Sequence, residues 1–260
     1  MTKPLYIPAG RAREYSAYAL NIYGRCDNKC TYCYVPRAMF RSDYFEGNGQ
    51  PRANLLRDLK KQLSKETIDK QVLLSFMGDP YGHENEVHGM TRKVLEILLA
   101  HNVPVAILTK GGTNCLKDLD ISKRFNGRIK IGASLTFYYP EDSLKYEPGA
   151  AWPVRRFEVL KRLRDEGIRN WASLEPIIDP AQALKIIEQT HSYVDHYKVG
   201  KINHCPELEN GVDWDRFVSE AVTLLRSLNK PFYVKKSLQE KNRSTALTAE
   251  ETDPDLLSVK

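Results

Sequence analysis

The sequence predicts an α/β fold in which short strands alternate with amphipathic helices that cover a parallel sheet. From about residue 70 onward, apolar runs of strand length alternate with stretches whose apolar residues recur every three or four positions. These patterns are typical of buried strands and of sheet-covering helices, respectively. Six strand–helix units can be counted, with residues 232–234 as a candidate seventh strand. Both a partial barrel and an open doubly wound sheet satisfy these numbers.

The expected strands are short apolar runs. They comprise residues 18–23, 72–76, 103–108, 129–135, 171–174 and 193–199. The expected helices each show one apolar face, which we interpret as core rather than as a binding surface. The four faces are formed by Leu55, Leu59 and Leu63; by Val87, Met90, Val94 and Leu98; by Val154, Phe157, Leu160 and Leu163; and by Trp214, Phe217, Ala221, Leu224 and Leu228.

Length and composition suit a folded protein. The chain has 260 residues, of which 42% are apolar, and we expect a lead segment at 1–15, a main domain at 16–241 and a mobile polar tail at 242–260. Because no signal sequence or long apolar stretch is present, we expect a cytoplasmic location and no membrane partner. The formal net charge of +6 fits a solvated surface, and it would also favour encounter with nucleic acid.

Three of the five cysteines, Cys26, Cys30 and Cys33, crowd into one loop after the first expected strand. An odd number of cysteines without a secretory signal favours metal ligation over disulfides. Three thiolates can bind three irons of a cubane cluster and leave the fourth iron open to a small molecule. A zinc site is the alternative, although no second paired-ligand motif follows. Its fourth ligand could be His83, His204, Cys115 or Cys205.

The C-x3-C-x2-C spacing, with Tyr32 directly before the last cysteine, resembles the signature of radical S-adenosylmethionine (SAM) enzymes. The similarity runs from about residue 10 to about residue 200 and points to the spore photoproduct lyase-like branch. The other matching segments are residues 10–15, 20–23, 33–34, 78–81, 108–110, 134–136 and 174–176. The resemblance implies a partial (β/α)6 barrel of the radical SAM type, a 4Fe-4S cluster on the three cysteines, and SAM with its adenine beside Tyr32.

The resemblance also implies a set of contacts to SAM. Gly78 and Asp79 would meet the amino group, Lys110 the carboxylate, Ser134 the ribose or the carboxylate, and Glu175 a ribose hydroxyl. The residues alone leave alternatives open. Asp79 could instead cap the following helix, Ser134 could be a structural residue of the sheet, and Glu175 could pair with a basic residue of the barrel.

The chemistry implied by the family is reductive cleavage of SAM to methionine and a 5′-deoxyadenosyl radical, with a flavodoxin- or ferredoxin-type protein as electron donor. Spore photoproduct lyase returns a hydrogen atom from a cysteine placed just before its acidic SAM contact, and that position here is Phe76. Tyr34 matches a tyrosine that the family uses near the radical. Cys115 and Cys205 are candidate replacement thiols, since both follow strands and could lie at the open rim of the barrel. The alternative is that each is an inert buried cysteine.

Three functions remain open at this point. The family branch and the net positive charge favour a radical enzyme that acts on a nucleic-acid base, in modification or repair. The same chemistry on a peptide or small metabolite is the nearest alternative. The third is a non-catalytic iron–sulfur or zinc module that binds nucleic acid.

Overall fold

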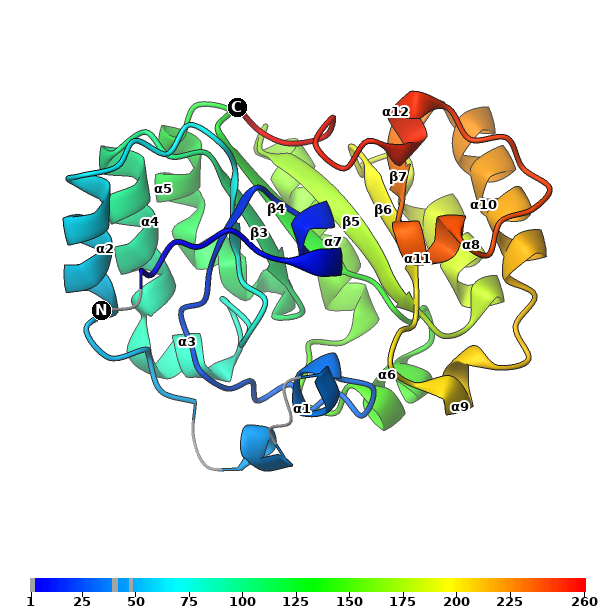
Figure 1. The fold of residues 1–260 in the computed structure, drawn as a ribbon, viewed down its shortest axis with the longest axis horizontal. Coiled ribbons are helices and arrows are strands. Elements are labelled where there is room, and N and C mark those ends of the chain that lie inside the picture. Colours follow the sequence, from blue (N-terminus) through cyan, green and yellow to red (C-terminus); the bar gives the residue numbers. More distant parts are fainter. Residues whose placement is uncertain (1–2, 39–41, 47–48) are drawn as a thin grey trace.

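The computed structural model describes residues 3–38, 42–46 and 49–260. The strands are β1 (Tyr18–Leu20), β2 (Val72–Leu74), β3 (Val105–Thr109), β4 (Ile129–Ser134), β5 (Arg169–Ile177), β6 (Tyr197–Lys201) and β7 (Phe232–Val234). They form one parallel sheet in the order β1-β2-β3-β4-β5-β6-β7. Because each strand pairs with the next along the chain, the sheet curls in one direction as a partial barrel (Figure 1). The open doubly wound alternative, which needs a reversal of strand order, does not apply.

A layer of helices covers the outer face of this sheet (Figure 1). They are α2 (Leu55–Leu63), α4 (Met90–Ala100), α5 (Leu119–Arg124), α7 (Pro153–Asp165), α8 (Pro180–Thr190) and α10 (Trp214–Ser227). The remaining elements are α1 (Tyr34–Ala38), α3 (His83–His88), α6 (Pro140–Tyr146), α9 (Pro206–Glu209), α11 (Lys236–Gln239), α12 (Ala249–Thr252) and the 3-10 turns η1 (Gly10–Glu14), η2 (Ser42–Phe45) and η3 (Gly112–Asp118). Within the described ranges, no helix is both long and apolar enough to cross a bilayer.

The apolar face expected from Val87 to Leu98 is divided between two helices. Gly89 has a φ of +57° and separates α3 from α4. A left-handed residue ends a helix at low cost only when it lacks a Cβ atom, so this glycine breaks the stripe. Val87 consequently lies exposed on α3, whereas Val94 and Leu98 are buried under α4.

The inner face of the sheet carries a second, smaller apolar cluster. Tyr15, which follows η1, packs there with Leu73, Ala106 and Trp171. Gly132 on β4 makes room for the Trp171 indole, because a Cβ atom at this position would lie 2.4 Å from the ring. The N-terminal segment therefore fills the concave side of the barrel and forms part of its interior (Figure 1).

The C-terminal segment contacts the amino ends of the strands. The Lys130 ammonium donates to the Leu257 carbonyl (2.6 Å), and the Val259 N–H donates to the Gln71 side chain (3.0 Å). Val259 itself is buried. The tail that we expected to be mobile is thus packed at these points, since buried polar groups at the barrel end require partners. The boundaries at residues 15 and 241 stay a prediction.

Candidate active site

A cavity of about 290 Å³ opens at the carboxyl ends of the strands. This is the edge where parallel α/β folds gather their ligand loops. All nine residues expected to hold the cluster or SAM lie on its wall: Cys26, Cys30, Cys33, Tyr32, Gly78, Asp79, Lys110, Ser134 and Glu175. The sequence expectation and the tertiary structure therefore agree on one location.

The three cysteines of the loop after β1 approach the cavity from one side. Cys30 is buried, Cys26 and Cys33 are partly buried, and none forms a disulfide. Burial raises the pKa of the Cys30 thiol to about 12 and raises the pKa of the other two thiols. Thiols in such surroundings ionise when a metal supplies compensating positive charge. The three thiolates, which are soft ligands, therefore suit an iron–sulfur cluster.

The described residues hold no group of three or more His, Cys, Asp or Glu side chains close enough to share one metal ion. A cubane cluster takes each thiolate on a different iron, so its ligands need not converge on one point. Of the residues considered for a fourth zinc ligand, His204 lies on the cavity wall, whereas the His83 side chain is 67% exposed on α3.

Backbone contacts from distant segments fix the cysteine loop. The Asp27 N–H donates to Glu84 of α3 (2.7 Å), and the Thr31 N–H donates to the Tyr146 carbonyl (2.9 Å). The Gly149 N–H donates to the Asn28 carbonyl (3.0 Å). A Cβ atom at Gly149 would lie 2.0 Å from the Asp27 carbonyl oxygen, so only glycine allows this approach. The loop is thus clamped between α3 and the segment after α6.

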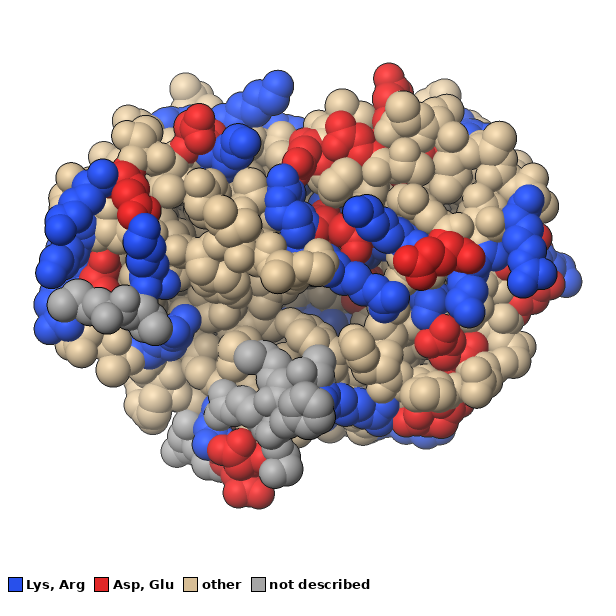
Figure 2. Space-filling view, viewed as in Figure 1, with Lys and Arg blue, Asp and Glu red and all other residues tan. Residues whose placement is uncertain are grey.

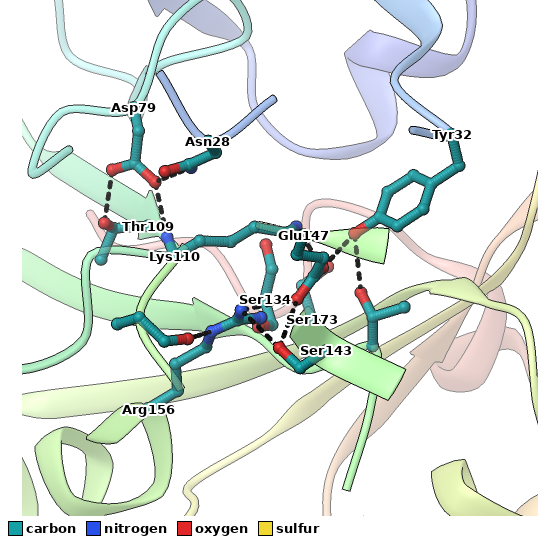
Figure 3. Close-up of polar contacts among 12 residues, drawn as sticks. Asn28, Tyr32, Asp79, Thr109, Lys110, Ser134, Ser143, Glu147, Arg156 and Ser173 are labelled. Carbon is teal, nitrogen blue, oxygen red and sulfur yellow. Dashed lines mark hydrogen bonds and ion pairs between the residues drawn. The ribbon is translucent and has the colours of Figure 1, made fainter. Parts of the chain in front are cut away.

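Asp79 is buried and accepts from four donors of its own chain. The side-chain amide of Asn28 (3.0 Å) and the N–H of Lys110 (2.6 Å) reach Oδ2, and the hydroxyl of Thr109 reaches Oδ1 (Figure 3). The N–H of Tyr81 (2.9 Å) also donates to Oδ1. An ionised carboxylate offers about four acceptor positions, and here all are used. Asp79 therefore joins the cysteine loop, the loop after β2 and the end of β3.

Lys110 extends from the end of β3 toward a buried glutamate that we did not single out from the sequence. Its ammonium lies 3.6 Å from Glu147 Oε1 and 5.9 Å from the centre of the Tyr32 ring. The Tyr32 hydroxyl also donates to Oε1, and Arg156 of α7 lies 2.5 Å from Oε2 (Figure 3). Burial opposes ionisation of Glu147, but the charges of Arg156 and Lys110 outweigh it and lower its pKa to about 2. Glu147 is thus a carboxylate at every ordinary pH.

Glu175, which also lines the cavity, pairs with a basic residue of the barrel, as one of the two alternatives for this residue foresaw. Its Oε2 lies 2.6 Å from the ammonium of Lys235, which follows β7, and also accepts from the Tyr15 hydroxyl. Gly200 on β6 admits both side chains, because a Cβ atom there would lie 3.0 Å from the Glu175 carboxyl carbon. Oε1 has a weaker contact, the Asn203 amide at 3.4 Å, and so retains capacity to accept from a ligand hydroxyl.

Gly78 and Tyr34 also lie where a ligand could reach them. Gly78 has a φ of +74°, and a Cβ atom there would lie 2.8 Å from the Arg25 carbonyl oxygen. The Tyr34 side chain, 40% exposed, donates to the Phe76 carbonyl (3.0 Å). Phe76 packs edge-on against Tyr15 at a centroid distance of 6.0 Å. Tyr34 and Phe76 therefore give the cavity an aromatic side.

Cys115 and Cys205 do not lie at the open rim, and the alternative that each is a buried cysteine applies. Cys115 lies in η3 with no exposed surface, inside the core between sheet and helices. Cys205 is 1% exposed at the start of α9, with its thiol 3.0 Å from Glu207. Neither residue lines the cavity. Small sulfur-containing side chains pack well in apolar surroundings, and both cysteines were drawn into the core.

Sequence reasoning missed Glu147, Arg156 and Lys235. Arg156 carries a faint signal, because it precedes Val159 and Leu160 by three and four positions and so lies on the buried face of α7. Glu147 precedes a Pro-Gly pair that reads as an ordinary turn. Lys235 directly follows the short strand β7 and carries no comparable signal.

Comparison with known proteins decides the family. The family model of the radical SAM superfamily matches residues 20–193, the segment that includes the cysteine loop and strands β2 to β5. The chain belongs to the radical SAM superfamily. Radical SAM proteins are enzymes that use a 4Fe-4S cluster together with SAM, and both cofactors apply to this chain. The non-catalytic module considered from the sequence is thereby set aside.

This radical SAM enzyme is similar to two uncharacterized proteins. One, from Methanocaldococcus jannaschii, is 26% identical over 69% of this chain and 68% of its own length. The other, from Acidianus two-tailed virus, is 26% identical over 69% of this chain, and the match spans 62% of the viral protein.

Two solved radical SAM structures share the fold. A mutant of spore photoproduct lyase with bound AdoMet and dinucleoside spore photoproduct has a TM-score of 0.67 and 13% identity, over 88% of this chain and 86% of that one. SuiB from Streptococcus suis, bound to S-adenosylmethionine, has a TM-score of 0.65 and 13% identity, over 88% and 53%. The expected partial barrel of the radical SAM type is therefore confirmed.

Proposed function

We propose that Cys26, Cys30 and Cys33 hold the 4Fe-4S cluster, that SAM lies in the adjoining cavity, and that the enzyme acts on a nucleic-acid base. One observation carries the first two assignments: the three cysteines, Lys110 and Glu175 all line the same cavity. When bound, the two cofactors supply one-electron cleavage of SAM and thereby a 5′-deoxyadenosyl radical.

The side chains of the cavity suit the different parts of SAM. Lys110 supplies a cation for the carboxylate, and a charge-assisted hydrogen bond in a partly dry site is strong. Ser134 and Glu175 offer polar oxygens to the ribose hydroxyls, and Tyr32 borders the adenine. Gly78 lines the cavity and is the position that the family resemblance gives to the amino group. Because the carboxylate of Asp79 is occupied by its own chain, we assign it to holding the loop that carries these contacts.

The inner wall can protect a reactive intermediate from water. Tyr15, Leu73, Phe76 and Leu108 line the deep part of the cavity with apolar surface. Excluding water prevents side reactions and keeps the target carbon close to the reacting atom. The chain thus provides apolar surface in the same cavity as the cofactor contacts.

The residues around the cavity entrance support a nucleic-acid base as the substrate. Figure 2 shows the hollow near the middle of this face, with Lys and Arg side chains among acidic ones around it. Arg11 and His204 line the cavity and can meet phosphate, while Tyr34 and Phe76 offer aromatic surface for a base. Spore photoproduct lyase, which shares the fold, has been crystallised with a dinucleoside. A flavodoxin- or ferredoxin-type protein would supply the electron.

The fold also supports a peptide substrate, because SuiB has been crystallised with its precursor peptide SuiA and has a TM-score of 0.63 in that state. Anaerobic reconstitution with iron and sulfide, followed by dithionite and SAM, decides between these substrates. We expect 5′-deoxyadenosine to form, and its yield to rise with added oligonucleotide but not with added peptide. If the yield of 5′-deoxyadenosine rises with peptide and not with oligonucleotide, the substrate is a peptide.

The cluster assignment has its own test. Cys30→Ala removes the protein ligand of one iron, so iron content and 5′-deoxyadenosine formation should fall sharply. Cys115→Ala is the matched control, because that thiol lies in the core outside the cavity, and its iron content should stay near wild type. Full iron content and activity in Cys30→Ala would refute the assignment.

A further inference from the structure

Glu147 lies directly behind the cofactor cavity without lining it. Its side chain has no exposed surface, and its Oε1 is shared by the Tyr32 hydroxyl and the Lys110 ammonium. Both partners do line the cavity. Figure 3 shows the Lys110 side chain running along the site to this carboxylate, with Tyr32 arriving from the cysteine loop. One buried carboxylate therefore contacts two cofactor-facing residues from different segments.

The other oxygen of Glu147 has a separate partner. Arg156, 1% exposed, lies 2.5 Å from Oε2 and also donates to the carbonyls of Ala151 (2.7 Å) and Ser134 (3.0 Å). Arg156 thus balances the charge of Glu147 and holds it in place. The charges of Glu147, Arg156 and Lys110 sum to +1. Glu147 can therefore orient Lys110 while the site keeps a net positive charge that attracts an anionic group.

This arrangement reduces the conformational entropy that a lysine side chain loses when it binds a ligand. A lysine side chain has four rotatable bonds, and ordering it on binding costs affinity unless it is ordered beforehand. The side chain of Lys110 is 13% exposed, yet its ammonium has no hydrogen-bond partner closer than the contact at 3.6 Å to Glu147 among the described residues. Glu147 can therefore limit the directions of the ammonium and leave its donors available to a ligand.

We propose that Glu147 is a positioning residue for SAM, which orients the Lys110 ammonium toward the SAM carboxylate and the Tyr32 ring toward the adenine. The inference rests on the proposed binding of SAM in this cavity. It goes beyond that proposal by assigning the affinity partly to a side chain that never touches the ligand.

The experiment is a double-mutant cycle on the reconstituted, anaerobic protein, with the dissociation constant of SAM as the readout. Lys110→Ala should weaken binding about ten- to a hundredfold, because a charged hydrogen bond is lost. Glu147→Gln should weaken it about two- to tenfold, as expected when one side chain is no longer ordered in advance. In a protein that already carries Lys110→Ala, Glu147→Gln should raise the dissociation constant of SAM by less than about a further twofold.

Two controls separate positioning from general damage. Glu141→Gln makes the same chemical change at an exposed site on α6 and should leave SAM affinity unchanged. Iron content and the electron paramagnetic resonance spectrum of the reduced cluster without SAM should match wild type in Glu147→Gln, since the cysteines remain. Equal effects of Glu147→Gln with and without Lys110 would overturn the inference while leaving the SAM site intact. Unchanged SAM affinity in Lys110→Ala would instead defeat the proposed site itself.

Glu147→Gln leaves Arg156 buried without a counter-charge, which can unfold the chain and also adds positive charge near SAM. The double variant Glu147→Gln/Arg156→Met keeps the net charge, so its SAM affinity is the decisive measurement. The inference is supported if the double variant binds SAM more weakly than wild type and this loss disappears when Lys110→Ala is also present. Wild-type SAM affinity in the double variant overturns the inference. If the double variant does not fold, Glu147→Gln alone decides. If neither takes up iron, the carboxylate serves the fold rather than Lys110, and the inference fails.

Discussion

The side-chain amide of Asn28 donates to Oδ2 of Asp79 over 3.0 Å, and this contact ties the cysteine loop to the loop after β2. The two residues are 51 positions apart. Because the same carboxylate also receives the N–H of Lys110, a single side chain sets the spacing between the cluster ligands and the lysine assigned to SAM.

Asp79→Asn should reduce iron uptake as well as SAM binding. The amide replaces one acceptor oxygen by a donor, so buried N–H groups lose a partner at a cost of about 1–3 kcal/mol each. Iron content after reconstitution and the free energy of unfolding in urea should both fall. Asp69→Asn, the same change at an exposed position, should alter neither. Full iron content with weakened SAM binding would instead return Asp79 to the role of a direct SAM ligand.

Gly149→Ala should disturb the cysteine loop. The new Cβ atom would lie 2.0 Å from the Asp27 carbonyl oxygen, so one backbone segment must move. We expect lower iron incorporation and a loss of about 1–3 kcal/mol in the free energy of unfolding, as is usual for overpacking. Gly24→Ala is the matched control, because it lies close to the same cysteines and no atom lies within 4 Å of its added Cβ. Equal iron incorporation and equal free energies of unfolding in the two variants would contradict the proposed role of Gly149 in holding the cysteine loop.

Lys198 should contribute stability that rises with pH between about 7 and 10.5. Burial, with a smaller effect from the neighbouring Lys235, lowers the pKa of Lys198 from 10.5 to about 7. In this interval Lys198 binds more protons in the unfolded chain than in the folded one, so at this residue raising the pH favours folding. Buried thiols such as Cys30, whose pKa is raised, contribute with the opposite sign, so the measurement is a difference between proteins. In urea unfolding, the free energy of wild type minus that of Lys198→Met should increase from pH 7 to pH 9, whereas the difference from Lys161→Met, at an exposed site, should stay constant.

Repair of the spore thymine lesion is not expected. The family resemblance places Phe76 where spore photoproduct lyase carries its hydrogen-donating cysteine, and a phenyl ring does not return a hydrogen atom as a thiol does. Since Cys115 and Cys205 lie off the cavity, neither can take over that step. The measurement is repaired thymine after anaerobic incubation of the reconstituted enzyme with lesion-containing DNA, dithionite and SAM. Efficient repair would show that no thiol is required.

The local sequence determined the strand–helix alternation, the cysteine loop and the places where Gly78, Lys110 and Ser134 follow or end a strand. Each is encoded by periodicity or by spacing within a few residues, and parallel strands bring their carboxyl ends to one edge whatever the rest of the chain does. The agreement at the cavity wall follows from that geometry.

Only the tertiary structure decided which partners these residues have. Tyr32 and Glu147 are 115 positions apart, and Tyr15 and Glu175 are 160 apart. It also placed Cys115 in the core and filled every acceptor position of Asp79. Such contacts depend on how strands and loops pack in space, because a buried charge must find a counter-charge or a donor wherever the fold provides one. No local pattern records that choice.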